Sequence, residues 1–352
     1  MSTDARAALS RATRGRSYTR RVRRSKALRA TAWGIVAAGI AAPLVRKRVP
    51  LPKTAMQAVA YAAPIGLSIA TRRTRARDVA VCGLQMWAYV SAYKSPHDDP
   101  DAQERKTHFR YPIVADRVLG LGELPTVRLQ RTLARVGPQG AEWRTLDKLL
   151  VWTHWVWFMV PHGAVAYTLF VAPERFPRAA AMTYTVFNVG ATIYWVLPTA
   201  PPWYAAEGAY ELDGMPSVSL APTAREGAEV RRMMVEYGEH FWRDGWGPLY
   251  SVLGGNPLAA MPSLHFATSV MAALLLAEVG PVAGALGSAY AITLGFALVY
   301  LGEHYVVDLL AGAALTAAVR RAAPRLAPVA GRFGRAIAAL EAIAHEGGTA
   351  RA

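Results

Sequence analysis

Two segments decide the fold of this chain: Met261-Pro-Ser-Leu-His265 and Gly302-Glu-His-Tyr-Val-Val-Asp308. Each lies where a long apolar run meets its flanking loop, so together they place two histidines and a carboxylate at the edge of a predicted membrane-embedded bundle. An ionised side chain costs about 3 kcal/mol at the centre of a membrane helix. Three such groups at helix ends therefore indicate chemistry rather than packing.

The composition also indicates a membrane protein. Of the 352 residues, 53% are hydrophobic and 18% are charged, whereas soluble domains carry about 25% charged residues. The net charge of +16 is concentrated in basic blocks, with ten basic residues between Arg6 and Arg29 and five more between Arg320 and Arg335. Such blocks beside apolar runs are typical of cytoplasmic loops and of contact with anionic lipid headgroups. We therefore expect a membrane partner and no nucleic acid, the partner that net charge alone would suggest.

The apolar runs predict the fold class. A bilayer core requires about 20 apolar residues per helical span, and six runs meet or approach this length. We predict an all-α integral membrane protein with a six-helix transmembrane core bundle, formed by Val79–Tyr93, Leu149–Val171, Ala179–Leu197, Leu264–Val279, Val282–Leu301 and His304–Val319. Two weaker runs, Trp33–Val45 and Ala55–Ala70, either form an extra hairpin or lie in the interface.

The same runs divide the chain into four predicted parts. A basic cytoplasmic segment covers residues 1–30, and the optional membrane hairpin covers 31–78. A membrane-embedded domain that contains both opening segments covers 79–322, and a basic C-terminal tail follows at 323–352.

The basic residues also predict the orientation of the chain in the membrane. With both Arg-rich ends in the cytoplasm, Arg72–Arg77 is cytoplasmic as well, and loops 94–148 and 198–263 are external. His265 and His304 then both reach the external face. We expect a plasma-membrane protein with its site on the extracytoplasmic side.

Both external loops contain predicted helices. Val127–Leu133 mixes apolar and basic residues and suits either the lipid headgroup layer or an ordinary protein surface. Arg225–Gly238 is the second helix, and Phe241, Trp242 and Trp246 follow it. Tryptophan is favoured at membrane interfaces, so this loop is expected near the bilayer surface.

The residue types in the two opening segments fit catalysis by histidine. His304 and Asp308 are four residues apart, so on a helix their side chains point the same way. A carboxylate that accepts a hydrogen bond from one ring nitrogen leaves the other nitrogen facing the site as a base or nucleophile. Pro262 and Ser263 are helix-start residues, and a helix N-terminus offers free N–H groups to an anion. A phosphate bound there would lie one turn from His265.

Structural roles are the alternative for these histidines. His304 and Asp308 could pair only to cap a helix junction, but His265 on the same predicted face disfavours this. His154 and His162 lie eight residues apart on one apolar run. For this second pair we favour hydrogen bonding to a neighbouring helix over a position in the cavity.

At Asn256–Ala267 and Tyr300–Asp308 the chain resembles the type-2 phosphatidic-acid phosphatase superfamily, and more closely its inositol-phosphorylceramide synthase-like (inositolphosphotransferase) branch. The resemblance implies a six-helix transmembrane bundle with its site at one membrane face. It also implies that His304 takes up the phosphoryl group as phosphohistidine and that Asp308 orients it. By the same resemblance, His265 protonates the departing alcohol and then deprotonates the acceptor. No metal and no cofactor are implied.

Three departures from the superfamily pattern affect the phosphate site. Leu264 replaces the glycine between the Ser and His of the central motif, and no Ser-Arg pair lies upstream of His304. Pro198–Trp203 replaces the Lys/Arg-Pro motif after the third span, and together with Tyr194 it fits the inositolphosphotransferase branch. A phosphoryl-transfer transition state needs cationic or N–H donors. The candidates for phosphate binding are Ser263, Arg225, Arg231, Arg232, Arg243 and Lys148.

The sequence therefore predicts a metal-independent membrane enzyme that acts on lipid phosphate esters through a phosphohistidine. We favour transfer of a phospholipid headgroup of the inositol-phosphate type, because a phosphodiester carries less charge and suits a site with few fixed cations. One alternative is a lipid phosphate or polyprenyl diphosphate phosphatase that uses the same residues. An alternative of another class is a non-enzymatic lipid transporter or degenerate binding protein. The expected partners are a lipid phosphate substrate and the membrane, and the oligomeric state is left open.

Overall fold

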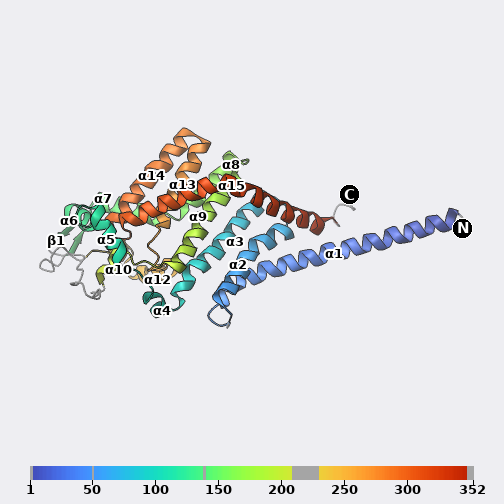
Figure 1. The fold of residues 1–352 in the computed structure, drawn as a ribbon, viewed down its shortest axis with the longest axis horizontal. Coiled ribbons are helices and arrows are strands. Elements are labelled where there is room, and N and C mark those ends of the chain that lie inside the picture. The colour runs from blue at the N-terminus through green and yellow to red at the C-terminus, as the bar shows by residue number, and fades with distance from the viewer. Residues whose placement is uncertain (1–2, 50, 138–139, 208–229, 347–352) are drawn as a thin grey trace. The chain divides into compact units, whose positions relative to one another are not determined.

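The computed structural model of this protein is mainly helical in the residues that it describes (Figure 1). A short antiparallel pair of strands, β1 (Arg135–Gly137) and β2 (Gly140–Glu142), interrupts the helices. The all-α fold class is therefore confirmed. The described residues are 3–49, 51–137, 140–207 and 230–346.

The chain divides into two compact units. The first consists of Met1–Ser91 and Ala323–Ala352, and the second consists of Ala92–Ala322. Helices α3 (Arg75–Lys94) and α15 (Val306–His345) each contribute residues to both units.

In the first unit, α1 (Thr3–Val45) and α2 (Lys53–Ala70) pack against each other as a helical hairpin. Small residues let the two helices approach closely, as they do in membrane bundles. A Cβ atom added at Gly39 would lie 2.6 Å from the Cβ atom of Ala63. The two weaker apolar runs of the sequence therefore form a pair of packed helices.

The C-terminal residues that were expected to form a basic tail are helical as far as His345. Within the first unit, Ser25 Oγ donates to the carbonyl oxygen of Ala344 at 2.6 Å, and Arg77 Nη1 lies 3.0 Å from Glu341 Oε2. The segment is rich in alanine, which has the highest helix propensity. The sequence-based prediction relied on its arginines and overlooked this propensity.

In the second unit, helix α13 (Leu264–Val279) packs against α8, α9 and α14, and α14 also packs against α6 and α7. These neighbours are α8 (Met159–Val171), α9 (Phe176–Val196), α14 (Pro281–Tyr300), α6 (Pro125–Leu133) and α7 (Thr145–Trp155). The shorter elements are η1 (Ser95–Asp98), α4 (Pro100–Glu104), α5 (Arg110–Leu119), α10 (Pro202–Glu207), α11 (Met233–Trp242), η2 (Arg243–Gly245) and α12 (Trp246–Leu253).

The run Leu149–Val171 is not one continuous helix, which corrects the prediction of a single span. It is divided between α7 and α8, with a turn at residues 156–158. Pro161 has no N–H to donate to the carbonyl oxygen of Trp157, four residues earlier, so the helical hydrogen-bond ladder is interrupted here. The turn brings Trp157 to α13, where its indole Nε1–H donates to Thr268 Oγ1 at 3.1 Å.

All six apolar runs of the predicted core are helical over most of their length. By length and composition, two described helical segments are long and apolar enough to cross a bilayer, Arg21–Val45 and Pro281–Tyr300. Helices α8 and α13 are apolar but shorter. The six-helix transmembrane core therefore stays a prediction.

The helix predicted at Val127–Leu133 is present as α6, but the helix predicted at Arg225–Gly238 begins later than expected. Within the described residues it starts at Met233, as α11. Arg231 lies just before the helix, and its backbone N–H donates to Gln130 Oε1 at 2.9 Å. Residues 225–229 lie outside the described residues.

Candidate active site

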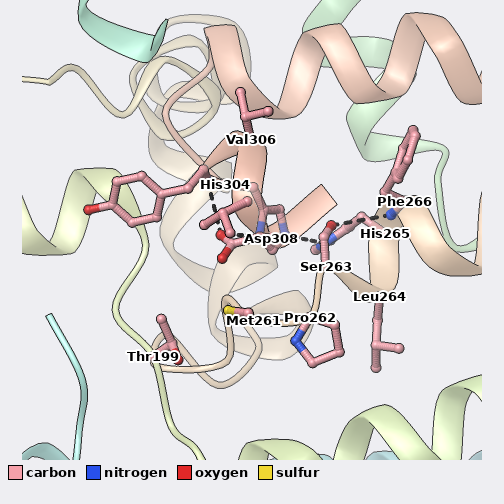
Figure 2. Close-up of polar contacts among 12 residues, drawn as sticks. Thr199, Met261, Pro262, Ser263, Leu264, His265, Phe266, His304, Val306 and Asp308 are labelled. Carbon is pink, nitrogen blue, oxygen red and sulfur yellow. Dashed lines mark hydrogen bonds and ion pairs between the residues drawn. The ribbon is translucent and has the colours of Figure 1, made fainter. Parts of the chain in front are cut away.

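The candidate site lies where the start of α13 meets the junction of α14 and α15 (Figure 2). His265 Nδ1 is 3.0 Å from His304 Nε2, and His304 Nδ1 is 3.3 Å from Asp308 Oδ2. His304 is 3% exposed and Asp308 is fully buried. The structure thus brings the three predicted catalytic residues into one chain of hydrogen bonds. Within the described ranges, no group of three or more His, Cys, Asp or Glu side chains is arranged to hold a metal ion.

His304 lies before α15 rather than on it, which corrects the prediction that His304 and Asp308 share a helix. Helix α15 begins at Val306, and Gly302, with a φ of +83°, turns the chain just before His304. Asp308 Oδ2 also accepts the backbone N–H of Tyr305 at 2.9 Å. This bond satisfies an N–H group that has no partner within the helix. One carboxylate therefore orients the imidazole and caps the helix.

Ser263 and Leu264 define the start of α13. Ser263 Oγ accepts the backbone N–H of Phe266 at 3.3 Å as an N-cap, and the Ser263 N–H donates to the carbonyl oxygen of Asp308 at 3.0 Å (Figure 2). Leu264 is buried against α9, where a Cβ atom added at Gly190 would clash with the leucine side chain. The leucine that replaces the superfamily glycine therefore fills the space left by a glycine on the neighbouring helix.

The stretch after α9 is held by backbone hydrogen bonds to two other segments of the second unit. The Thr199 N–H donates to the carbonyl oxygen of Leu258 at 3.0 Å, and the Thr199 carbonyl oxygen accepts the Ala260 N–H at 3.1 Å. On its other side, the His108 N–H donates to the carbonyl oxygen of Pro198 at 2.9 Å. These backbone bonds hold the segment that leads into the start of α13.

Arg232 is the predicted phosphate-binding cation that lies beside the segment carrying His304. Its guanidinium carbon is 3.4 Å from the ring centroid of Trp203, and its Nε is 3.3 Å from Oε1 of Glu303. Glu303 directly precedes His304. A cation–π contact and an ion pair therefore hold a largely buried arginine at the loop that carries this histidine.

The other predicted cations are placed differently. Arg231 Nε is 3.0 Å from Glu236 Oε2 on α11. Arg243 and Lys148 are exposed, and Arg225 lies outside the described residues. Among the predicted phosphate-binding cations, the structure therefore favours Arg232.

His154 lies beside the predicted catalytic residues, with its ring centroid 5.0 Å from that of His265. Neither His154 nor His162 has a hydrogen-bond partner for its ring nitrogens among the described residues. The predicted hydrogen bonds to a neighbouring helix are therefore wrong for this pair. The His162 ring packs instead against Phe158 and Phe187, whereas the His154 ring packs against that of His265.

Two residues of the site region were not predicted from the sequence: Asp116 on α5 and Gln130 on α6. Both side chains are buried. Gln130 donates a hydrogen bond to the carbonyl oxygen of Tyr300, and Asp116 accepts the backbone N–H groups of Val306 and Val307, on either side of the loop that carries His304. Burial raises the pKa of Asp116 to about 6, although hydrogen bonds from two backbone N–H groups act in the opposite direction. The sequence signal for Asp116 is a carboxylate directly after the apolar residues Ile113-Val-Ala115.

A family model described as the PAP2 superfamily matches residues 142–321 of this chain. The inositol phosphorylceramide synthase catalytic subunit aur1 of Schizosaccharomyces pombe is 29% identical over 178 residues, which cover 49% of this chain and 40% of that protein. The inositol phosphorylceramide synthase of Candida albicans is 26% identical over 174 residues, which cover 49% of this chain and 35% of that protein. The chain therefore spans less than half the length of these curated relatives. No solved structure shows a significant match.

Proposed function

Because this chain belongs to the PAP2 superfamily, we propose that it is a membrane enzyme that transfers or hydrolyses a lipid phosphate ester through a phosphohistidine. The observation that carries this proposal is the chain His265–His304–Asp308, with contacts of 3.0 and 3.3 Å. A histidine nucleophile requires a group that orients its ring and a second group that moves protons at the leaving and attacking oxygens. Asp308 and His265 supply these two groups.

In the proposed first step, the Nε2 lone pair of His304 forms a bond to phosphorus, and the bond from phosphorus to the leaving alcohol oxygen breaks. His265, as an imidazolium, donates a proton to that oxygen, which makes it a better leaving group. Asp308 accepts the Nδ1–H of His304 and stabilises the positive charge that develops on the ring. The bound phosphate replaces the 3.0 Å bond between the two histidines with a contact to each.

In the second step, the acceptor hydroxyl attacks the phosphohistidine. Neutral His265 takes the proton of this hydroxyl, the new bond from oxygen to phosphorus forms, and the bond from phosphorus to His304 Nε2 breaks. The acceptor is a second lipid for transfer and water for hydrolysis. Both reactions restore the starting protonation of the two histidines.

Arg232 and Ser263 are the residues that we propose for binding the phosphate oxygens. Arg232 is held by Trp203 and Glu303 beside the nucleophile. Ser263 Oγ already accepts the Phe266 N–H, but its hydroxyl hydrogen can still be donated to an anion. Because Glu303 already pairs with Arg232, the site offers little net positive charge, which suits a phosphodiester with one negative charge better than a phosphomonoester with two.

We propose that the donor is a phospholipid with an inositol-phosphate headgroup and that the acceptor is the hydroxyl of another lipid. The names of the two relatives, both inositol phosphorylceramide synthases, support this choice. The low net positive charge of the Arg232–Glu303 pair beside His304 supports it as well. A phosphatase for lipid phosphates or polyprenyl diphosphates is the second candidate, since it would use the same residues with water as acceptor.

We further propose that the six apolar runs predicted from the sequence, the first of them in α3, span the membrane as a six-helix bundle, with α7 and α8 together forming one span. Both chain ends would then be cytoplasmic, and the site would face the extracytoplasmic side of the plasma membrane. The exposed side chains of Trp152, Phe241 and Trp242 support an interfacial position for this end of the bundle.

A lipid-transfer assay with the full-length protein in nanodiscs tests the proposed function. Phosphatidylinositol and phosphatidic acid, each labelled in the phosphate, are offered with ceramide, with diacylglycerol or without an acceptor lipid. Label in a new lipid indicates transfer, and label in water-soluble products indicates hydrolysis. Both must vanish in His304→Ala and persist in His240→Ala, a matched change at an exposed histidine of α11. Lipid movement that persists in His304→Ala would instead indicate a transporter.

A further inference from the structure

The loop of residues 301–305, which carries the proposed nucleophile, joins α14 to α15, and we call it the nucleophile loop. At its start, Gln130 Nε2 of α6 donates to the carbonyl oxygen of Tyr300 at 2.9 Å. The same amide donates to the carbonyl oxygen of Arg231 at 2.8 Å and accepts the Arg231 N–H on Oε1 at 2.9 Å. One buried glutamine side chain therefore ties the nucleophile loop to the segment that carries Arg232.

At the other end of the nucleophile loop, Asp116 of α5 binds the start of α15. Its two carboxylate oxygens accept the backbone N–H groups of Val306 and Val307, each at 2.8 Å. The side chain is fully buried, and burying a carboxylate is costly unless it is hydrogen-bonded. The N–H groups at a helix N-terminus are suitable donors because the helix dipole favours negative charge there. Asp308 caps the same end of the helix from the side of the site.

We propose that Asp116 and Gln130 are positioning residues for the phosphoryl transfer described above, on whose occurrence this inference rests. They act through the backbone of the nucleophile loop rather than by contact with the substrate. By holding both ends of the loop, they keep His304 Nε2 in line with the phosphorus atom and at a set position relative to Arg232. A displacement of about 1 Å costs roughly 100-fold in rate, so small changes in these anchors have large effects on catalysis.

Two nearly isosteric substitutions test whether Asp116 and Gln130 position the nucleophile loop for catalysis or only stabilise the folded protein. Asp116→Asn removes the charge and leaves one acceptor for two N–H groups. Gln130→Glu replaces the donor to two carbonyl oxygens with another oxygen. The matched controls are Asp101→Asn, at an exposed position of α4, and Thr132→Ala, whose hydroxyl donates to the carbonyl oxygen of Arg128 within α6.

The variants are compared in nanodiscs with phosphatidylinositol as donor. We expect kcat to fall by about 10-fold to 100-fold in Asp116→Asn and Gln130→Glu, with KM changed by less than about twofold. Both substitutions leave buried polar groups without hydrogen-bond partners and should lower the unfolding temperature relative to the controls, so kcat is expressed per folded protein. Hydrogen–deuterium exchange at the amides of Val306 and Val307 should become faster in Asp116→Asn.

An unchanged kcat would overturn the proposal, whatever the exchange rates. A fall in kcat that matches the loss of folded protein would overturn it as well, because that result indicates support of the fold alone. Absence of phosphotransfer in the wild-type protein would remove the proposed function. In that case unchanged exchange at Val306 and Val307 in Asp116→Asn would show that Asp116 does not hold the nucleophile loop.

Discussion

Gly302 turns the chain two residues before the proposed nucleophile, with a φ of +83°. Glycine adopts this left-handed conformation without steric cost, whereas other residues rarely do. A Cβ atom at this position would also lie 2.8 Å from the carbonyl oxygen of Arg231, which is bonded to Gln130. The direction of the chain toward His304 thus depends on a residue without a side chain.

Substitution of this glycine by alanine is expected to affect catalysis more than folding. Gly302→Ala introduces about 1 to 3 kcal/mol of backbone strain, which the nucleophile loop can relieve by moving His304. We therefore predict a large loss of phosphotransfer rate with a lowered but measurable unfolding temperature. Gly280→Ala is the control, since its φ of −177° is ordinary extended backbone and no atom lies within 4 Å of the added Cβ. Equal activity of the two variants would contradict this prediction.

The site residues that could be predicted from the sequence stand in short motifs, whereas those that were missed have hydrogen-bond partners far away in the chain. His265, His304 and Asp308 could be predicted because each stands in a short motif whose spacing has a chemical meaning. Asp116 and Gln130 could not, because their partners Val306 and Tyr300 are 190 and 170 residues away in the chain. A buried polar residue acquires such a role only through the tertiary fold.

The packing of α9 against α13 accounts for Leu264, which stands where the superfamily pattern has glycine. Leu264, the first residue of α13, packs into the space above Gly190 of α9. The two residues complement each other in size. Close helix packing in membrane proteins commonly uses such small residues.

A double-mutant cycle tests this packing. Gly190→Ala should lower the free energy of unfolding by about 1 to 3 kcal/mol, the usual cost of overpacking, and Leu264→Ala by about 2 to 5 kcal/mol because of the cavity. In the double variant the new methyl group at position 190 occupies part of that cavity. The combined loss should therefore be smaller than the sum by more than about 0.5 kcal/mol, as measured by chemical unfolding in detergent. Additive losses would show that the two helices do not depend on this pair.

The helices themselves could largely be predicted from the sequence, because apolar runs of suitable length have few other stable structures in a membrane. Their interruptions could not. The break between α7 and α8 depends on Pro161 together with the contact of Trp157 to Thr268. His304 lies outside α15 because Asp308 caps the helix at Tyr305. The first interruption involves a tertiary hydrogen bond, whereas the second is a local cap between residues three apart in the chain.

For the whole molecule, the proposed topology places the β1–β2 hairpin outside the cell and the turn between α8 and α9 inside. Cys82 is the one cysteine of the sequence, so a Cys82→Ser background allows single cysteines to be introduced. Val136 is 69% exposed and the Glu174 side chain is 70% exposed, which makes both suitable for labelling. In intact cells, a membrane-impermeant maleimide should label Val136→Cys and spare Glu174→Cys until the cells are lysed. The reverse labelling pattern would contradict the extracytoplasmic placement of the site.

Mapping of a covalent intermediate decides whether His304 is the nucleophile of a membrane phosphotransferase. The protein in nanodiscs is mixed with phosphatidylinositol labelled in the phosphate, quenched at alkaline pH to preserve phosphohistidine, and digested for mass spectrometry. We predict a phosphorus-containing adduct on the peptide that carries His304, formed fast enough to account for turnover and absent in His304→Ala. Turnover without any adduct at His304, or an adduct on a different residue that persists in His304→Ala, would contradict the proposed mechanism.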